Sequence, residues 1–404
     1  MKTSEIFLAV AFMLCLLCAA PGCAQTVKPK RTAPGGNSAA RPSVKTIPLE
    51  IPITNQIYIQ VRINNSELMW FLLDTGATWT IIDVDKAKEL NIRSEGNLTL
   101  DMGQRHTVAT TFAKDAVLEL AGVKVAVPEL AVMPVKFRHA PQIVGVVGSE
   151  VFKRYVVAID YQTKTLNLFE PQSYHYTGPG QILPIELVEE YPHIMVTISR
   201  GKVDPVEARL GIDTGASQTV MLNGPFIEQN KLLETTEGTI KLSAGGLGGG
   251  NIIRRVRATS VKVGDIVFEH PLIDFSTGKG AGHDGVIGNG LLNRFKMITD
   301  YSRKRVILEP AEKMADPTDF DFFQFDLVSD GKNVKVSDVL QAAAAGIAGL
   351  KTGDVLLEIE GQSVANMSLT EIKRMFIWDG RDRVISVKRG AATLNIKIKT
   401  SRVS

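Results

Sequence analysis

Cysteine is nearly absent from this chain of 404 residues. Its three cysteines, Cys15, Cys18 and Cys23, all lie within the first 23 residues. The rest of the chain therefore has no thiol nucleophile, no cysteine metal site and no disulfide framework. Packing must supply the stability of everything that follows.

Charge of one sign and long apolar runs are also scarce. The 46 Lys and Arg nearly balance the 43 Asp and Glu, and the net charge of +3 predicts no nucleic-acid partner. Beyond residue 20, no run approaches the roughly 18 apolar residues that a membrane-spanning helix needs. The length and the 44% of hydrophobic residues fit two or three globular domains.

Several catalytic signatures are missing as well. The six histidines have no metal-binding spacing, and there is no GxSxG elbow, P-loop or dinucleotide fingerprint. The sequence thus predicts neither a metal nor an organic cofactor.

The one long apolar run lies at the N-terminus and has the architecture of an export signal. Ile6–Ala20 is apolar, and small residues follow it. Cleavage before Gln25 would make residues 1–24 a signal peptide, and lipid attachment at Cys23 is the alternative. Both predict an exported protein, which would be periplasmic, held at the cell surface or secreted.

The next segment, residues 25–46, is rich in Pro, Gly, Ser and basic residues and has no acid. It has too little apolar surface to offset the entropy of ordering, which predicts a flexible linker. Contact of its basic residues with an anionic surface is the alternative.

A duplication organises the chain that follows. DTGA occurs at Asp74–Ala77 and again at Asp213–Ala216, and an apolar-apolar-Gly triplet occurs at Val146–Gly148 and at Val286–Gly288. The first pair of motifs is 139 residues apart and the second is 140 apart. Both copies alternate apolar and polar residues between turn residues, which predicts two similar β domains.

The repeated triplets predict a pair of catalytic carboxylates. Each copy supplies one Asp, Asp74 or Asp213, and a pseudo-twofold axis would bring the two together. Two adjacent carboxyls hold a single proton. The ionised member can then activate a water molecule while the protonated member polarises a peptide carbonyl.

The neighbours of each Asp are predicted to shape the active-site loop. Gly76 and Gly215 would let the backbone turn tightly, so that the carboxylates face each other. Thr75 and Thr214 carry hydroxyls that could hydrogen-bond across the lobe interface.

Residues 49–312, with these motifs, resemble the retroviral-like (retropepsin-like) aspartic proteases in a single-chain form. The resemblance implies a mainly β fold, with two similar retropepsin-like β-barrel lobes forming a pseudo-dimer. Lobe 1 would span residues 47–172 and lobe 2 residues 181–312. Both DTG triplets are followed by Ala, as in retroviral-like members.

The resemblance also implies a flap that closes over substrate. In lobe 2 the matching segment is glycine-rich, although a plain flexible hairpin is the alternative. In lobe 1 the segment that begins at Asp101 is shorter and has less glycine. The candidate flap residues of lobe 2 are Gly245, Gly246, Gly248, Gly249 and Gly250.

A third unit, residues 322–404, resembles a PDZ domain, most clearly over Ala348–Val364. PDZ domains bind extended peptides by strand addition. The expected carboxylate-binding loop is missing, and residues 330–333 read as a hairpin turn instead. Peptide binding and a purely structural role therefore both stay open for this domain. The combination of protease and PDZ domain favours a bacterial envelope protein.

The sequence thus predicts an exported aspartic endopeptidase that acts on proteins or peptides with Asp74 and Asp213. The alternative is a catalytically silent, protease-fold protein that binds peptides. Two intact DTG triplets favour the enzyme.

Overall fold

The computed structural model describes the following residues: 45–52, 55–101, 107–135, 137, 140–201, 203–233, 240–246, 249–278, 282–311, 325–329, 332–339, 344–376 and 381–399. The predicted signal peptide, most of the predicted linker and the three cysteines lie outside these ranges.

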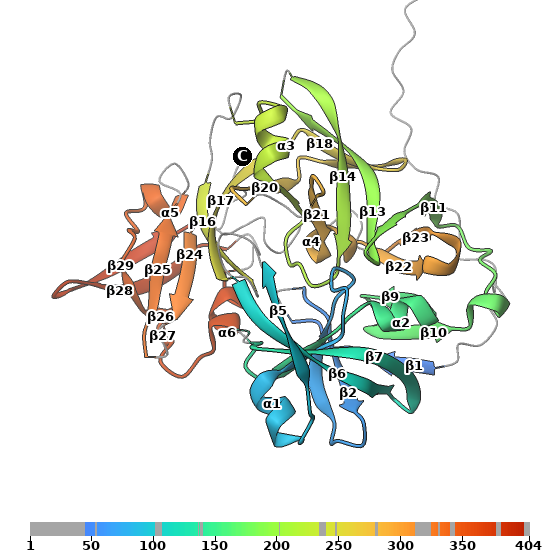
Figure 1. Ribbon diagram of the computed structural model, residues 1–404. Coiled ribbons are helices and arrows are strands. Elements are labelled where there is room, and N and C mark those ends of the chain that lie inside the picture. The colour runs from blue at the N-terminus through green and yellow to red at the C-terminus, as the bar shows by residue number, and fades with distance from the viewer. Residues whose placement is uncertain are drawn as a thin grey trace, which may run out of the picture. The chain divides into compact units, whose positions relative to one another are not determined.

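Lobe 1 is built on a seven-stranded sheet with the order β2-β3-β8-β4-β7-β6-β5, and a further pairing of β2 with β6 curls it toward a barrel (Figure 1). In β2 the apolar residues at every second position, Ile59, Val61 and Ile63, are buried, as the alternation of apolar and polar residues predicted. Its strands are β2 Tyr58–Ile63, β3 Met69–Leu73, β4 Ile81–Asp83, β5 Glu95–Asp101, β6 Thr107–Leu120, β7 Val123–Met133 and β8 Ile143–Val147.

Lobe 2 repeats this plan with the order β16-β17-β20-β15-β21-β14-β13-β18-β19, and β12 pairs with β13. Its strands are β12 Glu186–Val188, β13 Tyr191–Arg200, β14 Val203–Asp213, β15 Val220–Leu222, β16 Ile240–Gly246, β17 Gly249–Arg257, β18 Ser260–Val263, β19 Ile266–Glu269, β20 Leu272–Ser276 and β21 Gly285–Gly288.

A third sheet joins the lobes in the order β1-β10-β9-β22-β23-β11. Its centre is the antiparallel pair of β9 from the first repeat with β22 from the second, with Ile159 opposite Met297. One large apolar cluster includes residues of both repeats, so the lobes share a core. The strands are β1 Lys45–Pro48, β9 Val156–Asp160, β10 Thr165–Phe169, β11 Gln181–Pro184, β22 Phe295–Asp300 and β23 Arg305–Pro310.

Short helices follow the sequence motifs. A helix follows each apolar-apolar-Gly triplet and the first DTG, and Asp83 caps the helix after the first DTG by accepting from two backbone N–H groups. Helix α3 follows the second DTG, and Pro225 in its first turn suits a helix start. The helices of the two repeats are α1 Val84–Glu89, α2 Ser149–Arg154, α3 Gly224–Gln229 and α4 Asn289–Leu292, with 3₁₀ turns η1 Pro171–Ser173 and η2 Tyr301–Arg303.

The C-terminal unit is an αβ domain with its own core. Strands β24 and β25 pair as the predicted hairpin around residues 330–333. Gly349 and Gly353 have positive φ, which glycine adopts without strain. Its elements are β24 Phe325–Ser329, β25 Val334–Val339, α5 Ala344–Ile347, β26 Val355–Ile359, β27 Gln362–Ser363, α6 Leu369–Arg374, β28 Arg383–Arg389 and β29 Ala392–Ile398.

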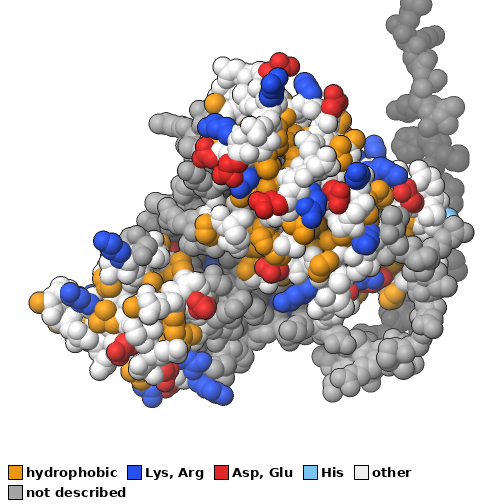
Figure 2. All heavy atoms as spheres, turned by 90° about the horizontal axis from the view of Figure 1, so that it is seen from below, with side chains coloured by type: hydrophobic (Ala, Val, Ile, Leu, Met, Phe, Trp, Pro, Cys, Tyr) orange, Lys and Arg blue, Asp and Glu red, His pale blue; other side chains and the backbone are white. Residues whose placement is uncertain are grey.

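The fold is mainly β with two barrel-like lobes, which confirms the predicted fold class. On the face drawn in Figure 2, acidic and basic side chains are interspersed and neither sign gathers, in line with the small net charge. No helix among the described residues is long and apolar enough to cross a membrane.

Candidate active site

The two DTG loops start where equivalent strands end. Leu73, the last residue of β3, pairs with Val147 of β8, and Asp213 at the end of β14 pairs with Gly288 of β21. The apolar-apolar-Gly triplets thus lie directly beside the loops. A Cβ on Gly148 would lie 2.4 Å from the Trp79 carbonyl oxygen, so this triplet needs glycine for close approach.

Two threonines tie the lobes together beneath the loops. The Thr75 hydroxyl donates to the Ile212 carbonyl at 2.5 Å, and the Thr214 hydroxyl donates to the Leu73 carbonyl at 2.9 Å. Each hydroxyl also accepts from the backbone N–H of the other threonine at 3.0 Å. These buried, reciprocal bonds are the interlobe contacts that the sequence predicted, and they fix the spacing of the two loops.

Two residues that sequence reasoning missed support the second loop. Asn289, the first residue of α4, donates to the Thr214 carbonyl at 2.5 Å and accepts from the Tyr161 hydroxyl at 2.7 Å. Tyr161 follows a strand of the shared sheet, so the first repeat props the loop of the second. Lobe 1 is braced differently, since the Thr80 hydroxyl donates to the carboxylate of Glu150 at 2.6 Å.

The carboxyl groups of Asp74 and Asp213 face each other across the lobe boundary. A Cβ built on Gly215 would lie 2.5 Å from Oδ2 of Asp74, and one built on Gly76 would lie 3.2 Å from Cγ of Asp213. Each carboxyl therefore packs against the glycine of the opposite triplet. Within its own loop, Asp74 accepts from the Gly76 N–H at 2.7 Å, and Asp213 accepts from the Gly215 N–H at 2.9 Å.

The role of the two glycines differs from the prediction. Neither has a positive φ, so the turn itself does not demand glycine. The demand comes from the opposite carboxyl, which occupies the space that a side chain would need.

This geometry predicts unequal effects for two matched substitutions. Gly215→Ala should lower kcat/KM for peptide hydrolysis by at least about a hundredfold, because the new methyl displaces the Asp74 carboxyl. In Gly76→Ala the new methyl carbon would lie 3.1 Å from its nearest neighbour, Oδ1 of Asp74, so kcat/KM should fall by less than about tenfold. Equal losses in kinetics of the two purified variants would contradict this steric account.

The electrostatic environment keeps a proton on the pair. Burial raises the pKa of Asp74 above its usual value, although hydrogen bonds from Gly76 and Gly215 act in the opposite direction. Burial also raises the pKa of Asp213, well above its usual value, and the charge of Asp74 raises it further. The pair is therefore singly protonated over a range that begins above the usual Asp pKa.

The raised pKa values predict a mildly acidic optimum. Ala77 and Ala216 supply no hydroxyl that could stabilise an ionised Asp carboxylate. Both limbs of the pH profile should therefore lie at higher pH than in a protein with Ser or Thr at these two positions. A variant carrying Ala77→Ser with Ala216→Ser should move both limbs of kcat/KM to lower pH. A wild-type maximum in strong acid, or an unmoved profile in the variant, would show that other groups set these values.

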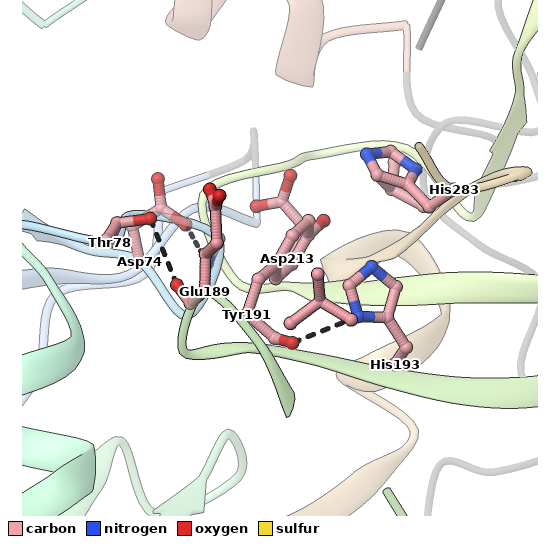
Figure 3. Close-up of a pocket in the computed structure, with 10 residues that line it drawn as sticks. Asp74, Thr78, Glu189, Tyr191, His193, Asp213 and His283 are labelled. Atoms are coloured by element: carbon pink, nitrogen blue, oxygen red, sulfur yellow. Dashed lines mark hydrogen bonds between the residues drawn. The ribbon is translucent and has the colours of Figure 1, made fainter. Parts of the chain in front are cut away.

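The dyad lies in a cavity of about 420 Å³ (Figure 3). Sequence reasoning missed most of its wall, and it considered the histidines only for metal spacing. The one sequence signal for the hairpin of β12 and β13 was the pair of polar residues Glu189 and Glu190, which stands between two runs of apolar residues. The cavity is lined by Asp74, Gly76, Thr78, Val188, Glu189, Tyr191, His193, Asp213, His283 and Val286.

The hairpin of β12 and β13 reaches from lobe 2 to lobe 1 at the edge of this cavity. Its turn residues Glu189 and Glu190 both have positive φ, at 49° and 67°, which is uncommon for residues other than glycine. The Glu189 carbonyl accepts from the hydroxyl of Thr78, four residues after Asp74 (Figure 3). The tip of the hairpin is thereby held beside the dyad.

The predicted flap of lobe 2 is a hairpin of β16 and β17, in which Gly245 pairs with Gly250 and Gly246 with Gly249. Gly248 lies outside the described residues. In lobe 1, β5 and β6 form the equivalent hairpin, and residues 102–106 at its tip lie outside the description.

Comparison with known families agrees with this geometry. The family described as "Aspartyl protease" matches residues 59–151 and again residues 195–291, and the family described as "PDZ domain" matches residues 319–376. Each lobe is a retropepsin-like aspartyl protease domain, and a PDZ domain follows.

Other comparisons add little to this assignment. No curated protein matches the chain. Among solved structures, the aspartic proteinase from Irpex lacteus matches with 13% identity and a TM-score of 0.43, over 68% of this chain and 99% of that one.

A metal site does not emerge from the described part of the two aspartyl protease domains and the PDZ domain. No group of three or more His, Cys, Asp or Glu residues there is arranged to hold an ion. The polar side chains in the cavity are instead those of Asp74, Asp213, Thr78, Tyr191, two histidines and the exposed Glu189.

Proposed function

We propose that this protein is an exported aspartic endopeptidase in which Asp74 and Asp213 activate the water that cleaves the peptide bond. The observation that carries the proposal is the close approach of each carboxyl to the glycine of the opposite triplet, inside one cavity. Buried carboxyls so close together share one proton, which is the state that this chemistry needs.

The proposed reaction uses both protonation states of the pair at once. The ionised carboxyl takes a proton from a bound water as its oxygen attacks the carbonyl carbon, while the protonated carboxyl gives its proton to the carbonyl oxygen. A tetrahedral diol results. Its collapse breaks the C–N bond as a proton passes through the dyad to the leaving nitrogen. The proton belongs to the pair, so neither Asp is assigned as the base.

The rest of the proposal extends beyond the dyad. The hairpin of β16 and β17 would serve as the flap over substrate, and its glycines suit a segment that must open and close. Export to the periplasm, cell surface or exterior of a bacterium, with or without lipid on Cys23, is supported by the apolar N-terminal sequence. The PDZ domain would hold a peptide or act as a spacer.

Digestion of a diverse peptide library tests the proposal. Wild-type protein should cleave internal bonds across mildly acidic to neutral pH, and Asp74→Asn, purified in the same way, should cleave none, with products read by mass spectrometry. Identical products from both proteins, or none from either, would favour a catalytically silent peptide-binding protein.

A further inference from the structure

The hydroxyl of Tyr191 is a buried polar group for which the described residues provide no hydrogen-bond partner. Buried hydroxyls in native proteins nearly always have a partner, so this one needs an explanation. Two other tyrosines near the loops conform to the rule. Tyr58 donates to Gln56 at 3.2 Å and Tyr161 donates to Asn289 at 2.7 Å.

The phenol lies beside the catalytic strand. A Cβ on Gly211 would lie 2.3 Å from both the hydroxyl oxygen and Cζ of Tyr191, so the ring covers the bare backbone of this glycine. Gly211 precedes Asp213 by two residues in β14 and so shares its face of the strand. Both Tyr191 and Asp213 line the cavity, and Figure 3 draws the phenol on the same side as the Asp213 carboxyl.

Two imidazoles fix the orientation of the ring. Its centroid lies 4.7 Å from that of His193 and 5.6 Å from that of His283, and the two imidazoles are 5.5 Å apart. Nδ1 of His193 also hydrogen-bonds the Tyr191 carbonyl at 3.0 Å. A phenol packed in this way has few rotamers, so its hydroxyl keeps one direction.

We propose that Tyr191 is a positioning residue of the dyad, whose hydroxyl donates a hydrogen bond to the carboxylate of Asp213 once that carboxyl ionises. This rests on the proposed function. The donor would replace the hydroxyl that Ala77 and Ala216 cannot supply.

The electrostatics favour this direction of donation. Burial raises the pKa of Tyr191 well above its usual value, and the charges of Asp213 and Asp74 raise it further, so the phenol stays protonated. Burial lowers the pKa values of His193 and His283, so both imidazoles are neutral near pH 7. The titratable or charged groups that interact with Tyr191 or with the residues around it are Asp74, Glu186, Glu189, Glu190, His193, Arg209, Asp213, His283, Asp284 and Tyr301.

Tyr191→Phe tests the proposal, because it removes the hydroxyl and keeps the ring. A donor to the charged form lowers a carboxyl pKa, so its loss should raise the acid-limb pKa of kcat/KM by about one unit. Below the optimum, kcat/KM should fall about tenfold, mainly through kcat. At a pH low enough to protonate both carboxyls, the thermal midpoint should not fall, since the hydroxyl then has no partner among the described residues.

Tyr301→Phe is the matched control. The Tyr301 hydroxyl is also buried without a partner in the described part of the chain, but Tyr301 does not line the cavity. This variant should leave the pH profile unchanged. An unshifted acid limb in Tyr191→Phe, an equal shift in both variants, or a lower thermal midpoint in Tyr191→Phe at that low pH would each overturn the proposal.

A second readout does not depend on turnover. With ¹³C-labelled aspartate, the carboxyl resonances that Asp74→Asn and Asp213→Asn identify can be titrated in wild type and in Tyr191→Phe. The dyad should titrate at higher pH in the phenylalanine variant, and an unchanged titration would overturn the proposal. If wild type cleaved no peptide, the proposed function would fail while this titration still decided the role of Tyr191.

Discussion

Asp74→Asn and Asp213→Asn are each expected to lower kcat/KM by at least about a thousandfold, and by similar factors. The two carboxyls share one proton and act as a unit, so an amide at either position removes both the base and the acid of the proposed reaction. Progress curves on a fluorogenic peptide measure the loss. A single variant with half the wild-type activity would contradict a shared proton.

Stability should move in the opposite direction. Folding raises the pKa of both carboxyls, so the folded protein holds their protons more tightly than the unfolded chain does. The folded state is therefore less stable at a pH above the usual Asp pKa, where the unfolded chain releases these protons. Each variant should therefore unfold at an equal or higher temperature than wild type at pH 7, and the difference should vanish in strong acid. The exposed Asp265→Asn serves as the control and should change neither activity nor this pH dependence.

Asp274→Ala is expected to lower the free energy of unfolding by about 3 kcal/mol. Asp274 is 2% exposed and lies in β20 directly opposite Arg255 of β17. Nε and Nη2 of Arg255 donate to its two carboxylate oxygens at 2.7 and 2.9 Å. The substitution would remove both hydrogen bonds and leave the largely buried guanidinium of Arg255 without its carboxylate. Chemical denaturation of the variant and of wild type would measure the loss of stability.

The other lobe provides the comparison. Lys114 and Glu129 form a cross-strand ion pair between β6 and β7, but both side chains are about half exposed, at 54% and 46%. Water screens such a pair, so Glu129→Ala should leave the denaturation midpoint nearly unchanged. Equal losses in the two variants would show that burial does not decide the strength of these pairs.

The sequence by itself determined the architecture, and it supplied the proposal that Asp74 and Asp213 form a catalytic pair. Two DTG triplets and two apolar-apolar-Gly triplets at one spacing are local patterns, and alternation of apolar residues predicts strands without knowledge of their partners. The mainly β fold, the retropepsin-like resemblance and the PDZ domain are all confirmed. The interlobe threonine bonds could also be predicted, because a pseudo-twofold axis places equivalent residues face to face.

Only the tertiary structure decided which side chains line the cavity and why the DTG loops need glycine. Tyr191 and His193 lie in β13, His283 lies just before β21, and the three side chains meet only because β13 and β21 flank β14. Likewise, Gly215 must be glycine because a carboxyl that is 141 residues away in sequence fills the space beside it. Such contacts depend on how whole strands pack, and no local pattern of residues encodes a distance between segments so far apart.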